Sequence, residues 1–420
     1  MTGWRQFLLP DTAPLRESRS FRLLWIGQLI SLSGSQLRLV ALPYQIFLLT
    51  GSSFAVGLIG VFQAVPLLLL SLFGGVIADA VDRRRLLLIT QIGLAAVSLA
   101  LALATQAGFA SVPLLYVLTA VGACFSALDN PTRASLAPTL VERRLIRAAM
   151  ALNQTIFQFA LVFGSVLAGI VIAHFGLAGA YWLDVGSFAA SFVAVWMLRT
   201  PPRARVERQP VLGALVEGLR YLGATRILLA TMSLDFLATF FGSPRALFPY
   251  YADRVFHVGP EGLGLLYASM GAGALVAAVA SGWTARVRRQ GLAVLVAVAV
   301  WGMAITLFGV LDERAFALAL VLLAVANGAD AVSSIFRGTI LQLVVPDALR
   351  GRLNAINIMF VLGGPQLGQF ESGSVAALWS PVASVVSGGV ACVASVVAIA
   401  AWIPEIVRYR AHHDEVAAVD

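Results

Sequence analysis

Residues 291–311 read GLAVLVAVAVWGMAITLFGVL, twenty-one residues in a row without a charged side chain. An α-helix rises about 1.5 Å per residue, so a run of this length crosses the hydrocarbon core of a bilayer, which is about 30 Å thick. Eleven more apolar runs of comparable length lie at 22–49, 54–78, 86–106, 112–135, 148–173, 180–198, 226–250, 262–284, 315–337, 353–375 and 381–403. The runs are continuous rather than alternating, which is typical of membrane helices. The sequence therefore predicts an all-α membrane protein with twelve transmembrane helices.

The composition of the whole chain agrees with a membrane protein. Of its 420 residues, 59% are hydrophobic and 12% are charged, whereas about 25% of the residues in soluble domains are charged. The mean hydropathy is +0.88. A soluble globule of this composition would expose large apolar patches. A soluble enzyme, a disulfide-rich secreted scaffold and a disordered chain are therefore excluded.

The basic residues and the cysteines exclude several kinds of binding site. All 29 basic residues are Arg, so the chain has no Walker A phosphate loop and no lysine Schiff base. The Arg residues are scattered between apolar spans, which argues against nucleic-acid binding despite the pI near 10.2. Cys124 and Cys392 lie inside apolar runs without metal-ligand spacing. We expect no metal, no cofactor and no nucleic acid as a partner.

The Arg residues outside the spans are distributed unevenly between the two sides of the membrane. The two tails and the even-numbered connections hold 23 of them, whereas the odd-numbered connections hold only Arg254 and Arg314. Basic residues accumulate on the cytoplasmic side of membrane proteins. The pattern therefore predicts that both termini are cytoplasmic, which agrees with an even number of spans.

The longest polar segment divides the chain into two halves of six spans each. We predict an N-terminal six-helix bundle at 1–198, a cytoplasmic linker at 199–225, a C-terminal six-helix bundle at 226–403 and a cytoplasmic tail at 404–420. The halves resemble each other, since the glycine-rich segment 163–169 of the fifth span has a counterpart at 363–369 in the eleventh. Two pseudo-symmetric bundles are typical of secondary transporters, whose site lies between the halves near the middle of the membrane.

Charged and polar side chains deep in the spans mark the candidate site, because a charge in the centre of a membrane helix costs about 2.5–3.5 kcal/mol on insertion scales. They fall on the first, fourth, seventh and tenth spans, in stripes along one helical face, except that Arg245 lies off the stripe of the seventh span by about 80°. The predicted substrate cavity is lined by Gln28, Ser35, Arg38, Asp129, Arg133, Asp235, Arg245, Asn327, Asp330 and Arg337. Asp184 and Glu371 lie nearer the outer ends of the sixth and eleventh spans.

Two structural interpretations of these polar residues stay open. The Ser and Gln residues could join neighbouring helices by hydrogen bonds, as they often do in membranes. Asp129 and Arg133 are four residues apart and could simply pair with each other.

The connection after the second span combines glycine, acidic and basic residues. Asp79 lies in the last turn of a helix, where the helix dipole disfavours a negative charge. Arg residues or the N-terminus of another helix must compensate it. We interpret Gly75, Asp79, Arg83 and Arg84 as a gate that locks two helices at one membrane face. A solvated loop would explain the Arg residues but not Asp79.

This connection resembles the signature between helices two and three of the major facilitator superfamily. Ala80 and Asp82 depart from the usual pattern, and the counterpart at 282–286 lacks its acidic residue. The antiporter motif of helix five appears at 164–169 without its proline, and 364–368 in helix eleven supplies Gly-Pro-x-x-Gly instead.

Within the superfamily the chain resembles the bacterial enterobactin exporter group at 74–85, 245–253, 264–268, 341–342, 346–354 and 380–384. The resemblance implies the major facilitator fold, a cavity lined by helices one, four, seven and ten, a monomer, and a place in the bacterial inner membrane.

We therefore expect a secondary active exporter of a small organic molecule, such as a siderophore, that works by alternating access and proton antiport. Asp235 and Asp330 are the candidates for proton coupling, and Arg38 and Arg245 would attract an anionic substrate. Multidrug or macrolide efflux is the alternative, favoured by Phe236, Phe240, Phe241 and Phe360. A transporter-like receptor and a membrane enzyme are remote alternatives, because the polar stripes are intact and the four His residues form no catalytic motif.

Overall fold

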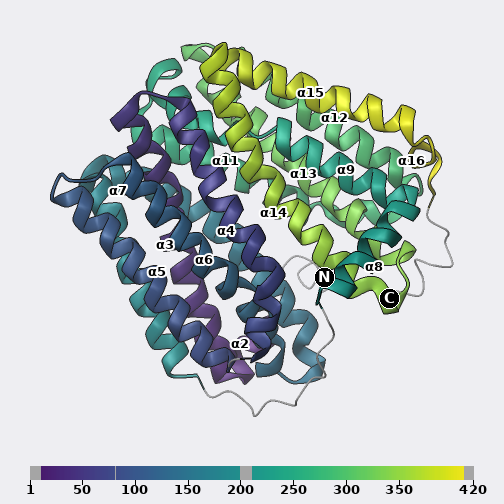
Figure 1. The fold of residues 1–420 in the computed structure, drawn as a ribbon, viewed down its shortest axis with the longest axis horizontal. Helices are drawn as coiled ribbons and strands as arrows, with labels where there is room; N and C mark the ends of the chain where they lie inside the picture. Colours follow the sequence, from purple (N-terminus) through teal and green to yellow (C-terminus); the bar gives the residue numbers. More distant parts are fainter. Residues whose placement is uncertain (1–10, 81, 199–210, 411–420) are drawn as a thin grey trace, which may run out of the picture. The chain divides into compact units, whose positions relative to one another are not determined.

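The computed structural model describes residues 11–80, 82–198 and 211–410, and the side chains at 71–80, 211, 212, 214, 215 and 348 lie outside this description. Every regular element in the described residues is helical (Figure 1). The long helices of the first half are α3 (Arg19–Thr50), α4 (Ser53–Ala80), α5 (Arg83–Gln106), α6 (Val112–Leu136) and α7 (Ile146–Trp196). Those of the second half are α9 (Arg226–Phe241), α11 (Gly259–Val279), α12 (Gln290–Gly309), α13 (Phe316–Val344), α14 (Asp347–Leu378) and α15 (Pro381–Trp402). The predicted all-α fold is confirmed.

Short elements complete the chain. They are α2 (Ala13–Glu17), α8 (Val211–Ala224), α10 (Phe248–Tyr250), α16 (Glu405–Arg408) and several 3₁₀ and π segments. The 3₁₀ turn Pro244–Leu247, α10 and the π segment Tyr251–Val255 continue the seventh span beyond the end of α9. Helix α8 occupies the second part of the predicted linker at 199–225, where no helix was predicted. Residues 199–210 of that linker lie outside the described residues.

Helix α7 combines the fifth and sixth predicted spans in one continuous assignment. Gly176 lies within it at φ 70°, ψ −179°, a conformation that interrupts helical geometry and that only glycine adopts readily. Its position falls between the predicted spans 148–173 and 180–198. The chain therefore turns at Gly176 and forms two helices here.

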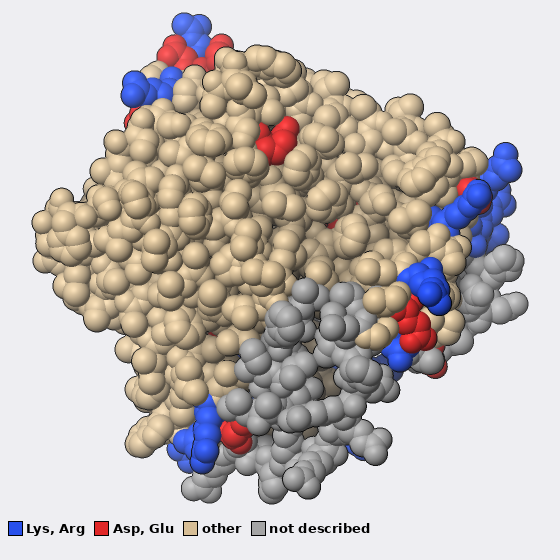
Figure 2. Space-filling model, in the orientation of Figure 1, with Lys and Arg blue, Asp and Glu red and all other residues tan. Residues whose placement is uncertain are grey.

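Nine helical stretches of the described chain are long and apolar enough to cross a membrane by length and composition. One of them, Arg143–Trp196, has 54 residues and includes the turn at Gly176. Helices α3 and α14 have 32 residues each and are also long enough to span a bilayer. These helices are consistent with the predicted twelve spans. Over α3, α5 and α7 in Figure 2, the visible face is mostly free of charged side chains, as lipid contact requires.

The described chain forms two compact units. Unit 1 contains the described residues within 1–51, 62–207 and 258–268, and unit 2 contains those within 52–61, 208–257 and 269–420. Each unit thus includes one short helical segment from the other half of the sequence. In unit 1 the start of α11 packs closely on α7, since a Cβ at Gly264 would lie 2.6 Å from the Ser165 carbonyl oxygen and 2.9 Å from Cα of Gly169. Glycine at these positions is what lets the two backbones approach.

Candidate functional site

The first polar cluster joins three helices of unit 1. The Nε atom of Arg38 on α3 lies 3.6 Å from Oδ2 of Asp184 on α7. Ser98 on α5 closes the triangle, because its hydroxyl accepts a 3.3 Å hydrogen bond from Arg38 Nη1 and donates a 2.6 Å hydrogen bond to Asp184 Oδ2. The three side chains form what we call the Arg38 cluster.

Burial explains why this cluster is fully paired. Asp184 is completely buried, so its charge needs a counterion and hydrogen-bond donors within the protein. The Ser187 hydroxyl faces Asp184 Oδ1 at 3.4 Å, and the guanidinium of Arg38 stacks 5.6 Å from the centre of the Phe188 ring. The side chain of Arg38 keeps 17% of its surface exposed. With Arg38 and Asp184 both ionised the cluster is electrically neutral, and Arg38 is its accessible member.

The second polar cluster of unit 1 is built around Asp129 and Arg133 of α6. Arg133 Nε donates to Asp129 Oδ2 at 2.6 Å, across one helical turn. Thr90 and Gln91 of α5 donate to Asp129 Oδ1 at 2.6 and 2.8 Å, and Arg133 Nη2 donates to Ser191 of α7 at 3.0 Å. Both charged residues are buried. The pairing anticipated from their four-residue spacing is what the structure shows, and it locks α5, α6 and α7 together.

A third, uncharged contact lies in the same unit. The Tyr181 hydroxyl donates to Oε1 of Gln45 at 2.7 Å, and Nε2 of Gln45 donates to Thr105 Oγ1 at 2.9 Å. Tyr181 is fully buried. This chain of hydrogen bonds connects α3, α5 and α7 in unit 1.

Unit 2 contains a charged cluster of different composition, the Arg337 cluster. Arg337 Nη2 on α13 lies 2.7 Å from Oδ1 of Asp235 on α9 and 3.5 Å from Oδ1 of Asp330 on α13. Arg337 Nη1 also donates to Ser333 Oγ at 2.9 Å. Two carboxylates thus share one guanidinium, and with all three groups ionised the cluster carries one net negative charge.

The helical register explains how these residues meet. Asp330, Ser333 and Arg337 are spaced i, i+3 and i+7, which places them on one face of α13. Asp235 reaches them from α9 and is buried, whereas 34% of the Asp330 side chain is exposed. Asp330 is therefore the member of the cluster that water reaches most easily.

Of the remaining predicted cavity residues, Gln28, Ser35 and Asn327 take part in hydrogen bonds within their own helices. Ser35 donates to the Ser31 carbonyl of its own helix at 2.8 Å, and the Gln28 carbonyl accepts from Ser31 at 3.3 Å. Asn327 donates to the Leu323 carbonyl one turn earlier on α13 at 3.1 Å. Arg245 lies in the 3₁₀ turn Pro244–Leu247.

The predicted gate is described in part. Gly75 lies in α4, and the side chain of Asp79 lies outside the described residues. Arg83 donates to the Ser135 carbonyl at 3.0 Å, and Arg84 donates to the carbonyl oxygens of Val195 and Trp196. Cations at the last carbonyls of helices complement the helix dipole. The two Arg residues thus hold the start of α5 against the ends of α6 and α7.

Asp82, a departure from the superfamily pattern, has a structural explanation. It is the N-cap of α5, and its carboxylate accepts a 2.9 Å hydrogen bond from the backbone N–H of Arg85. Aspartate is among the preferred N-cap residues, because its oxygen satisfies an N–H group that the helix leaves unpaired.

Sequence reasoning missed the residues that complete the unit 1 clusters. They are Ser98, Thr90, Gln91, Ser191 and, as a partner of Arg38, Asp184. The sequence placed Asp184 towards the outer end of the sixth span, and Asp184 was not among the residues predicted to line the cavity. A lone carboxylate in an apolar span must have a partner, and this signal could have paired it with the lone Arg38. The third and sixth spans carry no stripe of charged residues, so the sequence does not mark their polar side chains as part of a site.

The aromatic residues behind the efflux alternative also gather in unit 2. Phe236 lies 5.8 Å from Phe240 and 5.8 Å from Phe360, measured between ring centres, and Phe240 lies 5.0 Å from Phe241. A pocket of about 470 Å³ is lined by Ser233, Phe236, Leu237, Phe360, Ala398, Ile399 and Trp402. This pocket is apolar and lies on the side of α9 turned away from Asp235, since at about 100° per residue positions 233 and 237 lie about 160° from position 235 around the helix.

Comparison with known proteins agrees with this architecture. The family model for transmembrane secretion effectors, MFS_3, matches residues 10–415. The enterobactin exporters EntS of Shigella boydii serotype 18 and of Escherichia coli O1:K1 are each 28% identical over 417 residues, which cover 99% of this chain and 99% of theirs.

Solved structures show the same fold at low identity. A POT family transporter aligns with a TM-score of 0.74 at 12% identity, over 93% of this chain and 97% of its own. A D-xylose–proton symporter aligns with a TM-score of 0.70 at 14% identity, over 92% and 98%. A bacterial homologue of the iron transporter ferroportin aligns with a TM-score of 0.69 at 16% identity, over 93% and 98%.

The helices, the buried charges and the full-length matches lead to one assignment. A multi-pass membrane protein with this fold handles a small-molecule substrate, and its family consists of transporters rather than enzymes. The chain therefore belongs to the transmembrane secretion effectors of the major facilitator superfamily, and it is a membrane exporter.

Proposed function

We propose that the protein exports a siderophore from the cytoplasm by alternating access, in exchange for protons. The Arg337 cluster carries this proposal, because with its three groups ionised it holds one more negative charge than positive charge inside a membrane protein. The substrate class is supported by the full-length likeness to proteins named enterobactin exporters. In this proposal the protein is a monomer of the bacterial inner membrane with both termini in the cytoplasm.

The proton site follows from the charge of the Arg337 cluster. An uncompensated charge in a low-dielectric interior is unfavourable, so one proton on the cluster neutralises it. Arg337 is close to Asp235 at 2.7 Å and farther from Asp330 at 3.5 Å, and Asp330 is the more exposed carboxylate. Asp330 therefore accepts the proton from water, while Asp235 holds Arg337 in place.

The protonated and deprotonated clusters differ in what Arg337 holds. Only the pair of Asp235 with Arg337 joins α9 to α13, because Asp330 lies on the same helix as Arg337. When Asp330 is deprotonated, it competes with Asp235 for Arg337 and repels the Asp235 carboxylate across the two helices. When Asp330 is protonated, Arg337 is left to Asp235 and the contact between the helices is strengthened. A proton can therefore bias helix packing in unit 2, which is the requirement for coupling it to alternating access.

The Arg38 cluster is the proposed contact for the substrate. The side chain of Arg38 is partly exposed, and Asp184 and Ser98 hold its guanidinium in one orientation. A fixed guanidinium is suited to oxygen-rich anionic groups, such as the catecholates of a siderophore. Because Asp184 already balances its charge, Arg38 contributes directed hydrogen bonds more than net attraction.

The gate remains part of this proposal. Gly75, Asp79, Arg83 and Arg84 would lock α4 and α5 at the cytoplasmic face in one conformation and release them in the other. The contacts of Arg83 and Arg84 with the ends of α6 and α7 support a role at that face.

Transport into inside-out vesicles with an imposed pH gradient tests the proton role. We expect Asp330→Asn to abolish uptake driven by the gradient and to leave exchange of substrate for substrate intact, because exchange needs no net proton movement. Asp312→Asn is the matched control, since Asp312 is an exposed helix cap outside the spans. If Asp330→Asn and Asp235→Asn both transport at the native rate, the proton role is wrong.

Multidrug or macrolide efflux is the second candidate, and the apolar pocket beside Phe236 and Phe360 favours it. A knockout strain separates the two functions. Loss of siderophore from the medium with unchanged drug sensitivity supports siderophore export, and the reverse result supports drug efflux.

A further inference from the structure

Helix α8 has one face that packs on unit 2. Leu222 is buried, and Gly218 lies against Ile356 of α14. The Tyr221 hydroxyl donates to the Val344 carbonyl at 3.2 Å, and Glu217 pairs with Arg352 of α14. These contacts fix the rotation of α8 about its axis.

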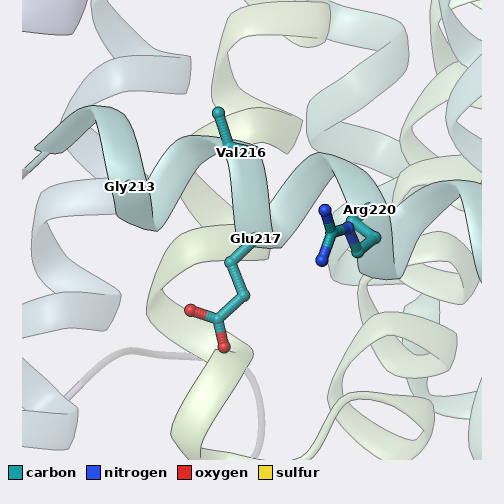
Figure 3. A pocket seen from close by; sticks show the side chains of 4 residues that line it. All are labelled: Gly213, Val216, Glu217 and Arg220. Carbon is teal, nitrogen blue, oxygen red and sulfur yellow. The ribbon is translucent and has the colours of Figure 1, made fainter.

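The opposite face of α8 is apolar and basic. Val216 is 58% exposed and Leu219 is 48% exposed, which is unfavourable for a helix in water. Arg220 follows Val216 by four residues and lies on the same side of the helix. In Figure 3, Val216 points away from Glu217, which extends towards the neighbouring helix α14.

A hollow of about 550 Å³ lies along α8 and is lined by Gly213, Val216, Glu217 and Arg220 (Figure 3). Glu217 is neutralised by Arg352. Arg220 has no acidic partner in the described part of the chain. The hollow therefore presents one uncompensated positive charge beside an apolar side chain.

Chain connectivity keeps α8 at the membrane surface. It ends at Ala224, and the membrane helix α9 begins at Arg226. With a single residue between the two helices, the C-terminal end of α8 cannot move away from the lipid headgroups.

We propose that α8 lies in the bilayer interface, with Val216 and Leu219 among the lipid chains and Arg220 bound to the phosphate of an anionic phospholipid. A helix with an apolar face and flanking Arg residues is the form that interfacial helices take. Basic residues next to a membrane helix attract anionic lipids of the cytoplasmic leaflet. This inference is independent of which substrate the protein exports.

The full-length protein in nanodiscs tests the depth of α8. An environment-sensitive fluorophore is attached to Val216→Cys in a chain that also carries Cys124→Ala. We expect blue-shifted emission that is quenched by nitroxide-labelled lipids. Emission typical of water, without quenching by lipid, would overturn the proposal.

Lipid binding tests the role of Arg220. Fluorescent phosphatidylglycerol is titrated into phosphatidylcholine nanodiscs that contain the protein. We expect Arg220→Gln to weaken its binding about fivefold, whereas Arg314→Gln, which removes the same charge from an exposed loop, has no effect. Equal binding by the two variants would overturn the assignment. Competition by millimolar inorganic phosphate would show a free-anion site and would also overturn it.

Discussion

Four aspartates lie within the predicted spans of the described chain, and three of them are each the closest acidic partner of an arginine. Asp184 pairs with Arg38, Asp129 with Arg133, and Asp235 with Arg337. Asp330 is left to share Arg337 at a longer distance, and it is also the most exposed of the four. A pair that is satisfied and buried holds helices together, whereas an excess carboxylate near water is able to change its charge. At the residue scale, this difference separates structural charges from the candidate for coupling.

The Arg38 cluster allows a prediction about stability. Asp184→Asn leaves the guanidinium of Arg38 without its counterion, and breaking a buried pair costs about 3–5 kcal/mol. We expect a large drop in the melting temperature of the purified protein in detergent. The double variant Arg38→Gln with Asp184→Asn should lose less than the sum of the two single variants, because it leaves no unpaired charge. Additive losses would show that the two residues do not interact.

At the scale of the element, the sequence predicted most helices to within a few residues. Long apolar runs define membrane helices directly, because lipid requires every backbone group to be satisfied within the helix. Helix α8 was not predicted, since it is short and follows a Pro- and Arg-rich stretch that has no long apolar run. The continuation of the seventh span beyond Phe241 was predicted as one helix, yet Gly242 ends α9 and a 3₁₀ turn follows.

The close packing of α7 on α11 within unit 1 gives a prediction for one glycine. Gly264→Ala places a Cβ against the Ser165 carbonyl oxygen and the Gly169 backbone, so the helices must separate. Overpacking of this kind costs about 1–3 kcal/mol. We expect lower thermal stability and slower transport in proteoliposomes.

Gly282→Ala is the control for Gly264→Ala, because a Cβ at Gly282 meets no atom within 4 Å. It should behave as the native protein does. Two variants with the same stability would show that close approach at Gly264 is unimportant.

At the scale of the whole molecule, the sequence predicted the family and the kind of residues in the candidate site, but not how those residues pair. Arg38 and Asp184 are 146 positions apart, and their meeting depends on the rotation of α3 and α7 about their axes. A stripe on one helix does not determine which neighbouring helix it faces. Asp129 and Arg133 were the exception, because their partner lies one turn away on the same helix.

The distribution of Arg over the connections predicts the orientation of the whole chain, since 23 lie on one predicted side and two on the other. Basic residues resist translocation, so the Arg-rich side stays in the cytoplasm. We expect a fluorescent protein fused after Asp420 to fluoresce in cells, because it folds only in the cytoplasm, and alkaline phosphatase fused there to be inactive. A phosphatase fused at 312, in the connection that holds Arg314, should be active, because that enzyme needs the disulfides that form outside the cytoplasm. The opposite pattern of fusions would reverse the orientation, and with it the direction in which Asp330 would carry protons.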